Sequence, residues 1–135
     1  MFELTINNNV YKFVFGMGFL KDLDPTITRK IDGVTGKVEK LGVQYAIAGI
    51  IDGNVEDLVT VLDYGNKYAA SDKSERLSRN DIEAYIEDEN TDIDELFKDV
   101  LDFLSKANVT KKIVANLLTA VEEQKAKQAA KNEQN

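Results

Sequence analysis

The hydrophobic positions at the start of the chain follow the period of a β-hairpin. Residues 2–6 alternate apolar and polar side chains, and residues 10–15 are almost all β-branched or aromatic. Asn7-Asn8-Asn9 lies between these segments, and asparagine tolerates the positive φ that tight hairpin turns require. The pattern therefore predicts a hairpin over residues 2–15. Its apolar face must pack on other elements, because a lone two-stranded hairpin is only marginally stable in water.

The apolar positions change to helical spacing further along the chain. Residues 19–23 predict a short helical turn before Pro25, and residues 27–37 predict a loop, or a short helix and loop. Residues 38–51 are apolar over most of a helical circumference, which is typical of a helix at the centre of a core. Residues 52–54 then end this helix and cap the next. The next helix carries a stripe at positions i, i+3, i+4 and i+7: Val55, Leu58, Val59 and Leu62.

Two capped helices are predicted after residue 77. Ser78 and Asp81 have the spacing of a helix cap, and the helix that follows extends to about Glu89. Thr91 or Asp92 caps the second helix. This helix has the cleanest apolar stripe in the chain: Ile93, Leu96, Phe97, Val100, Leu101 and Leu104.

The C-terminal segment predicts a last helix and a tail. Asn108 is the expected cap of this helix. The apolar residues that we expect it to bury are Val109, Ile113, Leu117, Leu118 and Val121. From Glu122 onward the chain is rich in Glu, Gln, Lys and Ala and has nothing to bury, so we expect residues 122–135 to be frayed or disordered.

These elements predict an α+β fold that is mostly α, with an N-terminal β-hairpin followed by about five helices. A length of 135 residues suits a single domain, which we place at residues 1–121. We find no internal repeat and no interdomain linker.

Composition narrows the chemistry that the chain can perform. It contains no Cys, His or Trp, so thiol and imidazole chemistry and most soft-metal sites are absent. The net charge of −7 argues against nucleic acid and against an anionic membrane surface. No apolar run approaches the roughly 20 residues of a membrane span. We therefore predict a protein without catalytic, cofactor-binding or metal-binding residues, and not an enzyme.

Two short motifs have a chemical and a structural interpretation. Gly16-x-Gly18 follows a strand like a dinucleotide-binding loop, but Lys21 stands where the third glycine is required. We interpret Gly16, Gly18 and Phe19 as a structural motif that turns a strand into a packed helix. The run from Asp88 to Asp92 resembles the opening of a calcium loop, yet Ile93 occupies the position that needs glycine. A helix end followed by a new cap is the better interpretation.

A second apolar stripe is the best candidate for a contact surface. Val61, Tyr64 and Tyr68 lie on another face of the helix that begins near residue 55. Either this helix is covered on two sides within the monomer, or the stripe serves self-association or partner binding. Phe103 is a further candidate, because it lies off the main stripe of its own helix.

Two segments of the chain resemble a known family. The first is Val14-Phe15-Gly16-Met17-Gly18-Phe19-Leu20-Lys21-Asp22-Leu23-Asp24. The second runs from Asn80 to Asp88, and continues through Ile93-Asp94-Glu95-Leu96-Phe97 to Asn108. Both are similar to the tail assembly chaperone family of long-tailed phages and prophages of Gram-positive bacteria.

The resemblance implies a non-enzymatic assembly factor in the host bacterial cytoplasm that is absent from the mature virion. Such proteins bind the tape measure protein, a long helical tail component, and keep it soluble during tail morphogenesis. They also self-associate, often into spirals. A frameshifted longer form is implied for many members, and here it would extend from the Lys- and Gln-rich tail.

Two other functions fit the same sequence. The chain could be a structural tail or head-completion subunit that is retained in the virion. It could also be a small adaptor module that binds a host protein as a stable monomer.

Overall fold

The computed structural model describes residues 2–33 and 36–133, and it begins with the predicted hairpin. Strands β1 (Phe2–Ile6) and β2 (Asn9–Phe13) pair antiparallel, with Phe2 opposite Phe13. Asn7 and Asn8 have φ values of 52° and 67°, which suits a two-residue hairpin turn. The face that carries Phe2 and Phe13 is buried, as its pattern predicted.

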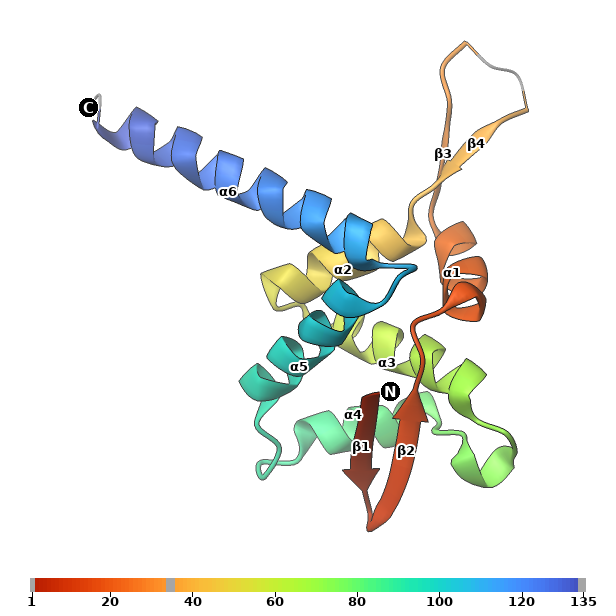
Figure 1. Ribbon diagram of the computed structural model, residues 1–135. Coiled ribbons are helices and arrows are strands. Elements are labelled where there is room, and N and C mark those ends of the chain that lie inside the picture. The colour runs from red at the N-terminus through yellow and green to blue at the C-terminus, as the bar shows by residue number, and fades with distance from the viewer. Residues whose placement is uncertain (1, 34–35, 134–135) are drawn as a thin grey trace.

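The segment between residues 24 and 41 differs from the prediction. After α1 (Met17–Leu23) and the short 3₁₀ helix η1 (Asp24–Thr26), the chain forms a second antiparallel hairpin. Its strands are β3 (Thr28–Lys30) and β4 (Val38–Lys40). The prediction of a loop over residues 27–37 missed β3, and the prediction of a helix from residue 38 was wrong for β4. Figure 1 shows this hairpin projecting from the rest of the molecule.

Helices α2 (Gly42–Asp52) and α3 (Val55–Ala69) meet at the predicted break. Gly53 ends α2 with φ 77°, and the Asn54 side chain accepts a hydrogen bond from the backbone N–H of Asp57. Both helices are packed on several sides: α2 contacts α1, α3, α5, α6 and η1, and α3 contacts α1, α2, α4 and β2. The predicted central position of the earlier helix agrees with these contacts, and its exposed side carries Gln44 and Tyr45.

The next two helices begin where the sequence predicted. A short 3₁₀ helix, η2 (Lys73–Glu75), leads to α4 (Arg79–Glu87), which starts with a complete capping box between Ser78 and Asp81. Asp92 caps α5 (Ile93–Lys106) by accepting from the backbone N–H of Glu95. The predicted stripe of α5 packs on the core, with Leu96, Val100 and Leu104 buried.

The last helix, α6 (Lys111–Glu133), is longer than predicted and begins later. The side chain of Asn108 accepts a hydrogen bond from the Lys111 ammonium and does not cap the helix. Thr110 is buried and donates its hydroxyl to the carbonyl of Leu104. The helix continues through the segment where we expected fraying, and every side chain described from residue 122 onward is exposed. Figure 1 shows α6 extending away from the body.

The N-terminal hairpin packs on α3, and the helices complete one core around them. The Val14 backbone N–H donates to the Gly65 carbonyl at 2.9 Å, which fixes β2 along α3. One cluster of buried apolar residues joins β1 and β2 to helices α1 through α6. The prediction of an α+β, mostly α fold with an N-terminal hairpin is confirmed: six α-helices follow the hairpin in the described ranges.

Candidate functional site: exposed apolar and acidic surfaces

The three residues of the second stripe on α3 do not lie on one surface. Val61 is fully buried, because α3 is packed on several sides, and it offers no side chain to a partner. Tyr64 is half-buried and packs against the core. Only Tyr68 is substantially exposed, at 48%. For Val61 the structure favours the interpretation in which the helix is covered within the monomer.

Tyr68 lies against the glycine motif of α1. A Cβ atom added to Gly18 would lie 2.5–2.7 Å from three carbons of the Tyr68 ring, so the ring sits directly on the glycine backbone. The Lys67 ammonium on α3 pairs with the Asp22 carboxylate on α1. This hydrogen bond, together with the Tyr68 hydroxyl, lowers the pKa of Asp22. The motif therefore has a packing role, and sequence spacing alone gave no sign that Tyr68 is its partner.

The glycine motif is completed by Gly16 and Phe19. Gly16 is the N-cap of α1 in an extended conformation, and Phe19 is fully buried. The rings of Phe19 and Phe15 meet edge to face, with centroids 5.3 Å apart. These contacts turn the chain from β2 into α1 and attach both elements to the core.

Phe103 belongs to an apolar groove between α5 and the N-terminal hairpin. Its ring is 36% exposed and lies edge-on to Phe2, with centroids 5.0 Å apart. We call it the aromatic groove. It has a volume of about 450 Å³, and its lining consists of Phe2, Phe13, Val14, Phe15, Phe103, Lys106 and Ala107. Of these residues, the sequence identified only Phe103 as a contact residue. Lys106 and Ala107 lie one turn further along from Phe103, whereas the four residues from the N-terminal segment come from about ninety to a hundred positions earlier and are brought to it by tertiary packing.

A second site of the same volume, about 450 Å³, lies between α5 and α6. Leu101 and Leu118 line it, together with charged residues of α5. Leu118 is 38% exposed, which is close to the exposure of Phe103. Because charged side chains make up most of its lining, this site is less suited to an apolar partner than the aromatic groove.

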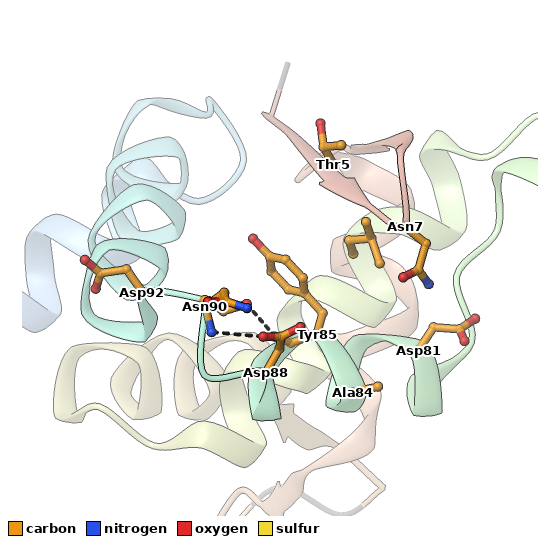
Figure 2. A pocket seen from close by; sticks show the side chains of 10 residues that line it. Thr5, Asn7, Asp81, Ala84, Tyr85, Asp88, Asn90 and Asp92 are labelled. Atoms are coloured by element: carbon orange, nitrogen blue, oxygen red, sulfur yellow. Dashed lines mark hydrogen bonds between the residues drawn. The ribbon is translucent and has the colours of Figure 1, made fainter.

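A polar hollow of about 440 Å³ separates β1 from α4 and the start of α5. Figure 2 shows Tyr85 extending from α4 into this hollow, with Asp81 and Asp88 beside it and Asp92 at its far side. Asp88 accepts a hydrogen bond from the Asn90 backbone N–H at 2.9 Å. The acidic residues of the calcium-like run thus occupy a helix end and a cap. In the described residues, no three potential ligands gather closely enough to hold a metal ion.

A family model described as phage tail assembly chaperone protein, TAC, matches residues 3–118. The chain belongs to this tail assembly chaperone family. The match extends from β1 into α6 and includes both the aromatic groove and the polar hollow. The chain matches none of the curated proteins and none of the solved structures with which it was compared.

Membership of the family points to a non-enzymatic role for this tail assembly chaperone. Across residues 2–33 and 36–133, none of its helices has the length and apolar character needed to cross a membrane. The family match ends at Leu118. Every side chain that the structure describes in α6 after Val121 is exposed. The exposed end of α6 therefore lies outside the part that defines the family.

Tyr68 in this chaperone allows a test of its packing role. We expect Tyr68→Ala to lower the free energy of unfolding by about 1.5 kcal/mol, because the ring loses its contact with Gly18 and α1. Tyr45→Ala is the matched control, since Tyr45 on α2 is similarly exposed, and it should cost about 0.5 kcal/mol or less. Urea unfolding measures both. Equal losses would mean that the Tyr68 ring contributes no more than an ordinary surface side chain.

Proposed function

We propose that this chaperone binds the tape measure protein, keeps it soluble during tail morphogenesis, and self-associates. It acts in the host bacterial cytoplasm and is absent from the mature virion. The observation that carries the proposal is the aromatic groove around Phe103, which lies within a chain of the tail assembly chaperone family. Exposed apolar grooves are suited to amphipathic or apolar helices of a partner.

The charge of the chain supports the same role. A long apolar helix that is exposed before assembly is prone to aggregate. A partner with a net charge of −7 can cover such a helix while its own charge keeps the complex dispersed. The aromatic side chains of the groove supply contact area at low cost in conformational entropy.

Co-expression with tape measure fragments tests the proposal. We expect the chaperone to raise the soluble fraction of a fragment that aggregates alone, and to elute with it in size-exclusion chromatography. A fragment whose solubility is unchanged and that forms no complex would remove the main support for this function.

Phe103→Asp tests whether the aromatic groove is the binding site. A charge at the centre of an apolar contact should weaken fragment binding about 30-fold, the range of an interface hot spot. Leu118→Asp is the control, because Leu118 is equally exposed but lies in the other apolar site. Isothermal titration measures both, after circular dichroism has verified that each variant folds. Equal weakening by the two substitutions would argue against the groove.

Mass spectrometry of purified virions separates this function from that of a structural subunit. A chaperone that leaves the tail should be absent from the particle. If the chain is present there at a constant ratio to the tail proteins, it is a retained component of the virion.

A further inference from the structure

We propose that the β3–β4 hairpin of one copy docks on the acidic α4–α5 surface of the next copy. This inference rests on the self-association in the proposed function and names the two surfaces involved. One surface is the projecting hairpin, and the other includes the polar hollow beside β1.

The β3–β4 hairpin projects from the body and contacts it near its base, where β4 lies beside η1. All six of its strand residues are exposed, including the apolar Val38. Ile27 and Ile31, which flank β3, are exposed as well. A two-stranded hairpin without a packed face is marginally stable, and its unpaired edges are open to another chain. The hairpin therefore has both the surface and the energetic reason to pack against a second molecule.

The hairpin is basic, while the rest of the chain is strongly acidic. Residues 27–40 contain four basic and two acidic side chains, a net charge of +2. Since the whole chain carries −7, all other residues together carry −9. In the described residues, the hairpin forms one ion pair, between Arg29 and Glu39, and no carboxylate lies within 4.0 Å of Lys30 or Lys37.

The complementary charge is concentrated in α4 and α5. Residues 81–102 contain ten carboxylates and a single lysine. Three of these carboxylates, those of Asp81, Asp88 and Asp92, line the hollow, and no basic side chain does. A concave acidic surface of this kind attracts lysine side chains over about a Debye length, roughly 8–10 Å.

The two surfaces lie too far apart to meet within one molecule. Figure 1 shows the β3–β4 hairpin at one end of the chaperone and α4 at the opposite end. Contact between them therefore requires a second copy. Because each copy presents one hairpin and one acidic surface, the contact is heterologous and continues from copy to copy until a ring closes or a helical filament forms.

A charge exchange between the two surfaces tests the inference. The hairpin variant is Lys30→Glu with Lys37→Glu, and the hollow variant is Asp88→Lys with Asn90→Lys. Neither variant removes a helix N-cap, because Ser78 and Asp92 are unchanged. The hairpin variant alone has acidic charge on both surfaces. In the hollow variant, two new lysines offset Asp81 and Asp92, so the hollow loses its net negative charge and no longer attracts the basic hairpin. The concentration at which half of the chains are assembled should therefore rise in both cases, on the order of a hundredfold for the hairpin variant and less for the hollow variant.

The equimolar mixture of the two variants is the decisive sample. In the mixture, the unchanged hairpin of the hollow variant meets an acidic hollow, and the acidic hairpin of the other variant meets the hollow that carries two new lysines. Assembly of the mixture should therefore recover to a concentration well below that of either variant alone. The control is Lys125→Glu with Lys127→Glu on the exposed end of α6, which should assemble like wild type. Light scattering over a concentration series measures all samples, and thermal unfolding verifies that the variants fold.

The outcomes separate this inference from the proposed function. If wild type assembles and the two variants assemble equally well, or if the mixture fails to recover, the inference is overturned while tape measure binding stands. A wild type that is monomeric at every concentration overturns both the self-association and the inference. If the hairpin variant no longer assembles but still binds a tape measure fragment, the hairpin serves contact between copies, as proposed.

Discussion

Replacing Asn66 with leucine is expected to lower the free energy of unfolding by about 4 kcal/mol. Asn66 is fully buried in α3 and uses all of its hydrogen-bonding groups. Its amide donates to the carbonyls of Lys12 and Glu75, and its oxygen accepts from the backbone N–H of Leu77 and from Arg76. Leucine would remove the partner that Asn66 gives to the two carbonyls and to the Leu77 N–H, whereas Arg76 keeps its bonds to the Leu77 carbonyl and to Asp63. Each buried polar group that is left unsatisfied costs about 1–3 kcal/mol.

The matched control for this substitution is Asn116→Leu on α6. Asn116 is exposed, so the same change of side chain should alter the stability by about 0.5 kcal/mol or less. Urea unfolding followed by circular dichroism gives both values. A loss of less than about 1 kcal/mol for Asn66→Leu would mean that water or a local shift satisfies the freed groups, and that Asn66 does not hold these segments together.

Asn66 also connects stability to the candidate binding site. It attaches the end of β2, at Lys12, to α3 and to the loop that leads to Leu77. The next residue along the strand, Phe13, lines the aromatic groove. Loss of Asn66 should therefore weaken the proposed binding of the tape measure protein through the position of the hairpin, whereas Phe103→Asp should act on the groove itself.

The local signals in the sequence predicted the elements that depend on local interactions. Ser78 and Asp81 form a capping box because both partners lie within one turn. The stripe of α5 was predicted because a single apolar face repeats at helical spacing from Ile93 to Leu104. The Asn-rich turn was predicted because few other residues adopt positive φ.

The β3–β4 hairpin was missed because its strands carry no alternating pattern. Its strand residues are exposed on both faces, so no apolar period distinguishes them from a loop. Val38 lies close enough to the apolar residues of α2 to extend their pattern, which made the helix appear to begin too early. At the start of α2, Gly42 lies against the Leu23 carbonyl and the Val43 N–H donates to the Asp24 carboxylate, and no local pattern contains these tertiary contacts.

The candidate site was only partly predictable for the same reason. Phe103 could be identified because it departs from the stripe of its own helix. Nothing local indicated that Phe2, Phe13 and Phe15 would join it, since the groove forms only when the hairpin packs beside α5. Val61 has the spacing of a surface stripe but is buried, because spacing cannot show how many neighbours surround a helix.

The contact of Gly42 with Leu23 leads to the second large effect that we expect. Gly42→Ala should lower the free energy of unfolding by about 3 kcal/mol, because a Cβ atom there would lie 1.9 Å from the Leu23 carbonyl oxygen. The neighbouring groups are backbone atoms and the Thr26 hydroxyl, which is already bonded to the same carbonyl at 2.6 Å. The start of α2 must therefore move away from the end of α1.

Gly16→Ala is the control for this substitution. A Cβ atom at Gly16 would meet only the Val14 side chain, at an ordinary contact distance of 3.5 Å, so its cost should be about 1 kcal/mol or less. Thermal and urea unfolding of both variants give the comparison, and similar losses would show that the two helices separate without strain. Gly42 also follows Leu41, whose N–H donates to the Ile27 carbonyl at the base of the β3–β4 hairpin. Movement of α2 would tilt that hairpin, so Gly42→Ala should also raise the concentration for half-assembly if the hairpin joins one copy to the next.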